Sequence, residues 1–261
     1  MKNRIVLVTL HVLTAVVTVA ACSRNEANSA ARAVETTTVG QPSRPSQDVP
    51  QDPASTIERH AKTLEKNPAD ANARETLKRL IDSPNPVSSE QSQRIREILR
   101  QYARAEKVTV ANKDEPGERL TVSGTVRNTA GQPVAGALIY VFQTDTNGHY
   151  TRTRVMNEPN ARLFGFVKTD NAGHYEFNTI RPGGYPGAPG REGEQWGIPQ
   201  HIHFQVAASG YQFRNFQMVF ADDPRMTPYW HDWARKGHNT VVAVNRDSDG
   251  GQHVVCDISL Q

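Results

Sequence analysis

The chain has 261 residues, of which 37% are hydrophobic. This is enough to bury one sizeable core and a second, smaller one. Its formal net charge is +3. The first 21 residues carry two basic residues and no acidic one, so the remainder has 28 basic against 27 acidic residues, a net charge of +1. No basic stripe is left that would indicate a nucleic-acid partner.

The N-terminus has the pattern of an export signal. Lys2 and Arg4 form a positively charged start, and residues 5–19 are mostly apolar but too short to span a bilayer comfortably. The stretch ends in small residues that run directly into Cys22. This junction resembles the lipobox of bacterial lipoproteins, in which the cysteine is acylated and becomes the mature N-terminus. The alternative is an ordinary signal peptide cut near Ala21.

The lipoprotein interpretation has three consequences. Acylated Cys22 would anchor the protein firmly, because each buried methylene contributes about 0.8 kcal/mol. Ser23 follows rather than an aspartate, which in bacterial lipoproteins implies sorting to the outer membrane. We therefore expect a signal peptide over residues 1–21 and a lipid-anchored protein of the cell envelope. Cys256 is the only other cysteine, so acylation of Cys22 leaves no intrachain disulfide.

Two segments of different character follow. Residues 22–54 have few large apolar groups and predict a flexible tether. Residues 55–107 show helical periodicity in three stretches, and we expect their first turns at Ser55 and Thr56, at Asp70 and at Ser88. Three short amphipathic helices make little core alone, so they are expected to pack on the following domain or on a second subunit.

From residue 108 to 261 the pattern is that of β-strands. Strands are predicted at 120–126, 137–142, 165–169, 174–180, 201–207, 215–220, 240–244 and 254–260. Many short strands with glycine-rich turns predict an antiparallel β-sandwich, so the fold class is mainly β with a small helical segment in front. Cys256 lies in an apolar run, which favours a buried strand residue over a nucleophile.

Two histidines on one predicted strand are the most informative residues. His201 and His203 are one residue apart, so their side chains share a face, while Ile202 and Phe204 point to the opposite, apolar face. Tyr185 lies on a loop of prolines and glycines that could reach the same point. Such a face can present two imidazole nitrogens to one metal ion, although two histidines alone fit a polar strand face equally well.

Several motifs occur in a fixed order between residues 119 and 220. They are Gly124-Thr125-Val126, Gly136-Ala137, Val141-Phe142-Gln143, Gly148-His149-Tyr150, the hairpin 170–177, residues 179–186, residues 199–204 and Phe216-Gln217-Met218. In this order they resemble the intradiol ring-cleavage dioxygenases, particularly protocatechuate 3,4-dioxygenase-like chains. The resemblance covers a little over a third of the chain and implies the β-sandwich of these oxidoreductases.

The resemblance implies a ferric site. In that family Fe(III) is held by two tyrosinates, two histidines and a water-derived hydroxide, which here implies Tyr150, Tyr185, His201 and His203. Phenolate oxygens suit a trivalent ion. An aromatic diol would displace the hydroxide and Tyr185, and these would take up its protons. O2 then opens the ring between the two hydroxylated carbons, both oxygen atoms are incorporated, and a muconate-type diacid results.

The resemblance also assigns substrate-side residues, with two departures. Gln217 matches a family position near the substrate and is a catalytic candidate. Ile198 stands where the family commonly has an arginine that supports the ionised substrate, so an electrostatic contribution is lost. Phe142 stands where protocatechuate enzymes carry a tryptophan, which indicates a pocket shaped for another catechol. The arginines that could replace the missing charge are Arg181, Arg191 and Arg214.

Two other functions stay open. A non-catalytic transthyretin-like or carboxypeptidase-regulatory-like β-sandwich module shares the glycine pattern of residues 124–137, and Ile198 favours it, but such a module has no reason to keep the two tyrosines and two histidines together. A zinc hydrolase could use the histidine pair, with Glu192 or Glu194 as the only nearby bases. Because N-terminal helices help related enzymes to dimerise, the resemblance favours a homodimer.

Overall fold

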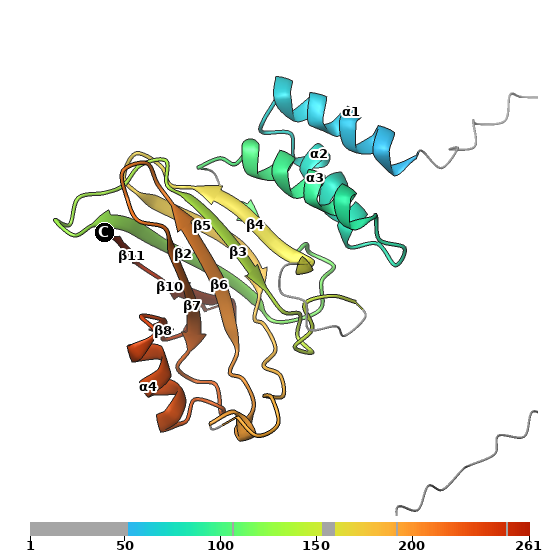
Figure 1. The fold of residues 1–261 in the computed structure, drawn as a ribbon. Helices are drawn as coiled ribbons and strands as arrows, with labels where there is room; N and C mark the ends of the chain where they lie inside the picture. Colours follow the sequence, from blue (N-terminus) through green and yellow to red (C-terminus); the bar gives the residue numbers. More distant parts are fainter. Residues whose placement is uncertain (1–51, 106, 153–159, 192, 249) are drawn as a thin grey trace, which may run out of the picture. The chain divides into compact units, whose positions relative to one another are not determined.

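The computed structural model describes residues 52–261 apart from residues 106, 153–159, 192 and 249. The predicted signal peptide, the lipidation candidate Cys22 and nearly all of the predicted tether lie outside the described residues. In the described part, two β-sheets pack face to face and three helices precede them in the chain (Figure 1). None of the described helices has the length and apolar character needed to cross a membrane.

The helical segment begins earlier than predicted. Helix α1 (Pro53–Lys66) is capped by Asp52, whose Oδ2 accepts a hydrogen bond from the Ser55 N–H at 3.2 Å. The expected start at Ser55 and Thr56 is therefore wrong, because a proline at the first helical position starts the helix two residues upstream, inside the predicted tether. Helices α2 (Ala71–Ile81) and α3 (Ser89–Gln101) are capped by Asp70 and Ser88, as predicted.

The strands of the second half form two sheets. Their bounds are β1 (Val108–Thr109), β2 (Arg119–Asn128), β3 (Leu138–Gln143), β4 (Leu163–Lys168), β5 (His174–Ile180), β6 (His201–Ala207), β7 (Arg214–Phe220), β8 (Thr240–Val242), β9 (Asn245–Arg246), β10 (Gln252–Val255) and β11 (Ile258–Leu260). One sheet has the order β1-β5-β2-β10-β9, with β11 also paired to β2, and the other has the order β4-β3-β6-β7-β8. The predicted β-sandwich behind a helical segment is confirmed.

Both sheets are mixed, which corrects the expectation of an antiparallel sandwich. Strand β2 pairs antiparallel with β5 but parallel with β10 and β11, and β7 pairs parallel with β8. The predicted strand 254–260 breaks at Cys256, whose carbonyl oxygen accepts a hydrogen bond from Tyr175 Oη at 2.5 Å and would lie 2.1 Å from a Cβ at Gly124. Cys256 is buried, and burial raises the pKa of its thiol to about 12, so it is not a nucleophile at neutral pH.

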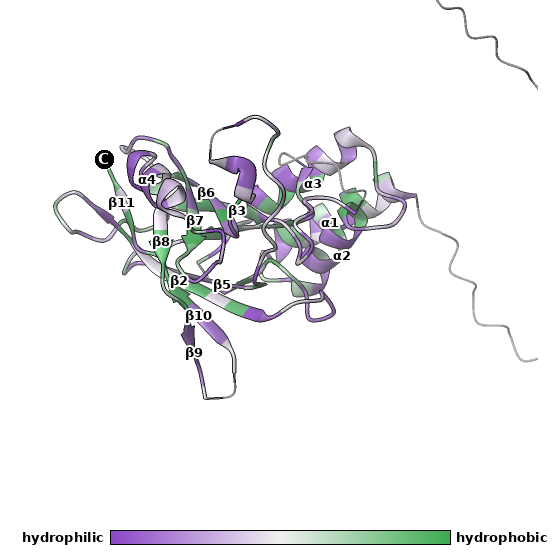
Figure 2. Cartoon of the chain, turned by 90° about the horizontal axis from the view of Figure 1, so that it is seen from below, coloured by the Kyte–Doolittle hydropathy of each residue, from purple (hydrophilic) through white to green (hydrophobic). Residues whose placement is uncertain are grey.

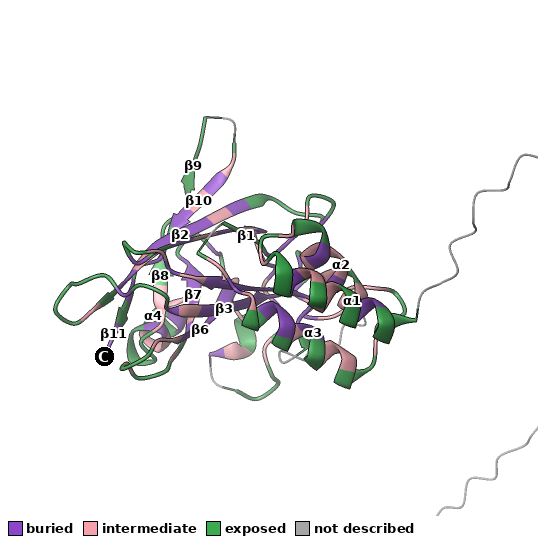
Figure 3. Cartoon of the chain, turned by 90° about the horizontal axis from the view of Figure 1, so that it is seen from above, coloured by how far each residue is buried: buried purple, intermediate pink, exposed green. Residues whose placement is uncertain are grey.

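Apolar residues form two clusters, one on each face of the β4-β3-β6-β7-β8 sheet. The first lies between the sheets and includes Ile202 and Phe204 of β6. The second joins the helices to the outer face of the same sheet and includes Phe142 of β3 and Phe164 of β4. Figure 3 shows largely buried strands and helices α1–α3 with one side exposed, and Figure 2 shows hydrophilic residues along these helices. The helical segment thus packs on the following domain, which is one of the two alternatives predicted for it; the other was a second subunit.

Helix α4 (Pro228–Lys236) has no counterpart among the predicted elements. Thr227 is its N-cap and Pro228 its first residue, a start signal that is visible in the sequence. The ring of Tyr229 packs on Gly193, where a Cβ would lie 2.3 Å from it. Helix α4 therefore supports the loop that leads from Tyr185 to strand β6.

Candidate metal centre

His201 and His203 project from the outer face of β6, the face that the helices cover. Ile202 and Phe204 point into the core between the sheets, so the predicted alternation is confirmed. Both histidines are buried. His201 Nδ1 lies 2.7 Å from the Pro199 carbonyl oxygen, a group that can only accept, so Nδ1 carries a proton and Nε2 is left as the lone-pair nitrogen.

Tyr150 is placed by a tight turn that follows β3. Asp145 Oδ1 accepts hydrogen bonds from the N–H groups of Asn147 at 2.9 Å and His149 at 3.1 Å. Gly148 has a φ of +77°, and a Cβ there would lie 2.6 Å from the Gly184 carbonyl oxygen. A glycine is thus required for the turn to approach the loop of Tyr185, and the Tyr150 side chain ends fully buried.

Tyr185 is held by backbone contacts on both sides. It forms an antiparallel bridge with Ile198, with the Tyr185 N–H donating to the Ile198 oxygen at 3.2 Å and the Ile198 N–H to the Tyr185 oxygen at 2.7 Å. Towards Tyr150, the Gly183 N–H donates to the Asp145 oxygen at 2.7 Å, and Thr144 Oγ1 donates to the Gly183 oxygen at 2.8 Å. The two tyrosine loops therefore form one hydrogen-bonded unit.

The polar atoms of these four side chains converge on one point. Tyr150 Oη lies 2.7 Å from His203 Nε2, 3.1 Å from His201 Nε2 and 3.5 Å from Tyr185 Oη. His201 Nε2 lies 3.1 Å from His203 Nε2 and 3.5 Å from Tyr185 Oη. Donors bound to one ion at about 2.0–2.1 Å and separated by about 90–120° lie about 2.9–3.6 Å apart. The separations of 3.1 and 3.5 Å fall in this range, whereas the 2.7 Å between Tyr150 Oη and His203 Nε2 is a hydrogen-bond distance that a bound ion would lengthen slightly.

The protonation of the histidines fits metal binding. Burial lowers the pKa of His201, against an opposing contribution from the Pro199 carbonyl. Burial, together with the neighbouring His201, lowers the pKa of His203 to about 2. Both imidazoles are therefore neutral at pH 7, the form that coordinates a metal. Two phenolates added to two neutral imidazoles give a hard donor set with charge −2, which suits a trivalent ion such as Fe(III).

The comparisons with known proteins identify the family. A family model described as "Dioxygenase" matches residues 98–261, more than half of the chain. The chain belongs to the intradiol ring-cleavage dioxygenases. This family normally uses Fe(III), so the donor set described above agrees with the metal of its relatives.

Individual relatives match part of the chain. The protocatechuate 3,4-dioxygenase beta chain of Burkholderia cepacia is 36% identical over 123 residues, which cover 45% of this chain and 51% of the relative. A catechol 1,2-dioxygenase of Pseudomonas sp. is 34% identical over 122 residues, 42% of this chain and 39% of the relative. The chain thus spans about half or less of these relatives. Among solved structures, catechol 1,2-dioxygenase from Pseudomonas arvilla C-1 is 21% identical with a TM-score of 0.47, over 61% of this chain and 57% of the other.

The three residues predicted on the substrate side of the intradiol site lie next to the donor set. Phe142 stacks on His203, with ring centroids 4.3 Å apart and planes 5° apart. Gln217 of β7 is directly opposite His203 in the sheet, so its half-buried side chain shares that face. Ile198 packs against the apolar cluster that contains Phe142 and Tyr185. These residues give the site one apolar wall and one amide.

The arginines considered as replacements for the missing family arginine all have partners elsewhere. Arg181 pairs with Asp222, Arg191 pairs with Glu194, and Arg214 donates to the Ser259 oxygen. A fourth arginine, Arg225, lies beside the loop of Tyr185. A Cβ added at Gly184 would lie 3.0 Å from its guanidinium, and one added at Gly197 would lie 3.2 Å from it. Gly184 and Gly197 each precede one residue of the Tyr185–Ile198 bridge, and successive residues of a strand face opposite sides. Arg225 therefore lies on the side opposite the Tyr185 ring.

The zinc-hydrolase alternative finds no support in the described part of the chain. There, no group of three or more His, Cys, Asp and Glu side chains could hold a metal ion. Glu194, one of the two predicted bases, accepts hydrogen bonds from the Ala188 N–H and from Arg191. Glu192 lies outside the described residues.

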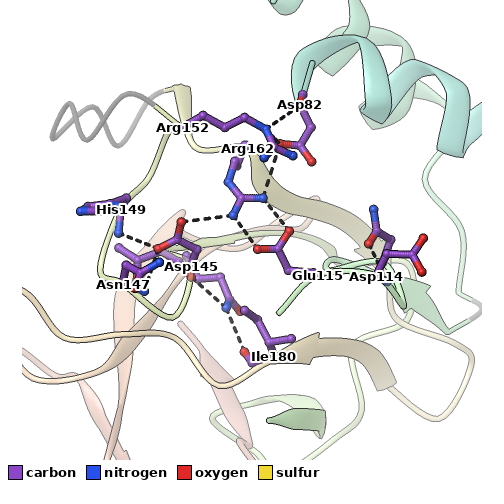
Figure 4. A network of polar contacts seen from close by, with 12 residues as sticks. Asp82, Asp114, Glu115, Asp145, Asn147, His149, Arg152, Arg162 and Ile180 are labelled. Atoms are coloured by element: carbon purple, nitrogen blue, oxygen red, sulfur yellow. Dashed lines mark hydrogen bonds and ion pairs between the residues drawn. The ribbon is translucent and has the colours of Figure 1, made fainter. Parts of the chain in front are cut away.

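The supporting residues of the site were not foreseen. The run Asp145-Thr146-Asn147-Gly148 is a recognisable turn signal, and it could have predicted that Asp145 orders the turn before Tyr150. Arg162, which contacts the same aspartate, gives no such local signal, because its partners come from three distant segments (Figure 4).

Proposed function

We propose that this protein is an Fe(III)-dependent intradiol dioxygenase that opens the ring of a catecholic aromatic between its two hydroxylated carbons. Both atoms of O2 enter the product, a muconate-type diacid. The observation that carries this proposal is the convergence of Tyr150, Tyr185, His201 and His203 in a member of this family. Two of the four donors are phenol oxygens, which as hard anionic phenolates favour ferric iron over zinc.

Each residue of the site would have a separate role in the reaction. Bound ferric iron would make the catecholate electron-rich enough to react with O2. Tyr185 is the donor suited to leave, because its side chain is 8% exposed whereas that of Tyr150 is fully buried. Its Oη would take one of the two protons that the diol releases. Tyr150, fully buried in its ordered turn, stays in place. The amide of Gln217 would donate a hydrogen bond to a substrate oxygen, and Phe142, on the other side of His203, would with Ile198 keep water from the bound ring.

Iron loading tests this proposal. We expect the purified protein to bind Fe(III), to become red-brown through charge transfer from tyrosinate to iron, and to change its absorption band when a catechol is added. Oxygen uptake should accompany the loss of catechol, and with ¹⁸O2 the product should carry two labelled atoms.

The other outcomes separate the competing functions. A colourless protein that binds no iron would overturn the proposal. A coloured protein that takes up no oxygen with any catechol would indicate a metal site without the activity. Ile198 would then be the reason for the lost turnover, since electrostatic groups of the kind it replaces contribute about 10²–10³-fold in rate.

We further propose that the protein is anchored in the cell envelope through a lipid on Cys22, facing the periplasm or the cell surface. The positively charged start, the short apolar stretch and the small residues before Cys22 support this. We expect cells fed a labelled fatty acid to incorporate the label into the protein, Cys22→Ser to abolish it, and Cys256→Ser to retain it. Label retained by Cys22→Ser would contradict the anchor. The homodimer stays a prediction.

A further inference from the structure

Arg162, the residue immediately before β4, is a buried arginine surrounded by three carboxylates (Figure 4). Its Nη1 and Nη2 donate to Glu115 Oε2 and Oε1 at 2.6 and 2.5 Å. Nη2 also lies 3.2 Å from Asp145 Oδ2, and Nη1 lies 3.4 Å from Asp82 Oδ1. The three acids come from the turn before Tyr150, from the segment before β2 and from the end of α2. One guanidinium therefore joins three segments that are distant in the sequence.

Arg162 holds both ends of the turn that carries Tyr150. At the first end, it binds one oxygen of the Asp145 carboxylate while the other oxygen accepts the N–H groups of Asn147 and His149. At the second end, the Arg162 backbone N–H donates to the Tyr150 carbonyl oxygen at 2.9 Å. Because Arg162 fixes the orientation of the Asp145 carboxylate, it also fixes the oxygen that the turn amides of Asn147 and His149 bind.

The charges of this network depend on the guanidinium. Burial opposes the charge of Arg162, but the hydrogen bonds and charge of Glu115, with those of Asp82 and Asp145, outweigh it and raise the pKa of Arg162. Glu115 is 6% exposed and Asp145 is 8% exposed, so without Arg162 two poorly solvated carboxylates would face each other. Only a planar fork can serve Glu115 bidentately and still reach Asp145.

We propose that Arg162 is a positioning residue for Tyr150, and that through Asp82 it makes the order of the Tyr150 turn depend on the docked helical segment. Arg152 strengthens the second link, because its Nε donates to the Asp82 carbonyl oxygen at 2.7 Å. The consequence for metal binding rests on the proposed iron site, whereas the ordering of the turn does not.

Hydrogen exchange of the metal-free protein tests the ordering directly. In Arg162→Lys, which keeps a charge but loses the fork, and in Arg162→Met, we expect the amides of Asn147, Gly148 and His149 to exchange at least about 10-fold faster than in the wild type. The amides of β6 should keep their protection. Fe(III) affinity should fall about 10- to 100-fold, as it does when the support of a metal ligand is lost.

Arg96→Met is the matched control. Arg96 is a second arginine of the same helix–sheet interface, and it donates to Tyr140 Oη at 3.1 Å and to the Ala161 oxygen at 2.7 Å. Both of these partners lie outside residues 145–150, so Arg96→Met should leave the exchange of the three turn amides unchanged. If Arg162→Met does not fold, the double variant with Glu115→Gln removes the uncompensated charge and takes its place.

The outcomes are distinct from those of the iron-loading experiment. Wild-type exchange rates at the turn in the Arg162 variants, or equal loosening in Arg96→Met, would overturn the positioning role. A wild type that binds no iron would overturn the proposed function, but the exchange rates would still decide whether Arg162 orders the turn. A loosened turn with unchanged iron affinity would overturn the link to the metal site.

Discussion

We expect Tyr150→Phe to abolish the proposed Fe(III) binding and catechol turnover. The substitution deletes a single oxygen atom, but this atom lies within 3.5 Å of the other three donor atoms, so the shell loses its central member. Loss of a supporting residue typically lowers metal affinity about 10- to 100-fold, and we expect loss of the ligand itself to exceed that range. The measurement is iron content after dialysis, together with the visible absorption band.

The matched control for this variant is Tyr140→Phe. Tyr140 lies on β3 beside Phe142 and belongs to the same apolar surroundings, but its Oη accepts a hydrogen bond from Arg96 rather than joining the donor set. We expect it to keep the iron, the colour and the turnover. His203→Ala should behave like Tyr150→Phe, because it removes the nitrogen 2.7 Å from Tyr150 Oη. If either Tyr150→Phe or His203→Ala keeps its colour or its turnover, the ligand assignment is wrong.

We expect Phe164→Ala to lower the free energy of unfolding by about 3–5 kcal/mol, the range for truncating a buried phenylalanine. The Phe164 side chain is fully buried between β4 and the helices, and the Arg96 guanidinium lies 4.0 Å from its ring centroid. Truncation therefore leaves a cavity and also removes a cation–π contact, which contributes about 0.5–2 kcal/mol. Urea unfolding of the metal-free protein measures the loss.

Phe213→Ala is the control for this prediction, because Phe213 is 62% exposed. Exposed truncations usually change stability by less than about 0.5 kcal/mol. Because Phe164 belongs to the apolar cluster that also contains Tyr150 and Tyr185, we further expect the helical segment of Phe164→Ala to become more susceptible to proteolysis and its iron affinity to fall. Equal unfolding free energies for Phe164→Ala and the wild type would show that the helices do not dock there.

Local signals in the sequence were sufficient to predict the bounds of several elements and the sheet face to which His201 and His203 point. Strands β5 and β6 begin and end at the predicted residues, and the caps of α2 and α3 are those that the sequence indicated. Each of these depends on the alternation of side chains or on a cap within three residues. The start of α1 was misplaced because Ser55 and Thr56 imitate a cap, whereas Asp52 and the proline after it form the real one.

Pairing between distant strands could not be read in the same way. Parallel pairing of β10 and β11 with β2 joins the C-terminus to the first long strand of the sandwich, and a strand pattern is the same whichever neighbour it meets. The break at Cys256 has the same origin, since its carbonyl oxygen meets Gly124, more than a hundred residues earlier. Register and direction are properties of a pair, so one segment alone does not carry them.

The sequence by itself determined the β-rich class and the shared face of His201 and His203, whereas the two tyrosines beside them came from the resemblance of its ordered motifs to the intradiol dioxygenases. Only the tertiary structure decided that Tyr150 Oη lies within 3.5 Å of the other three polar atoms and that Ile198 pairs with Tyr185 through its backbone. It alone also brought Asp82, Glu115 and Asp145 around Arg162. The physical reason is range: periodicity and capping act over a few residues, whereas a buried donor set and a shared guanidinium exist only when segments far apart in the chain have folded together.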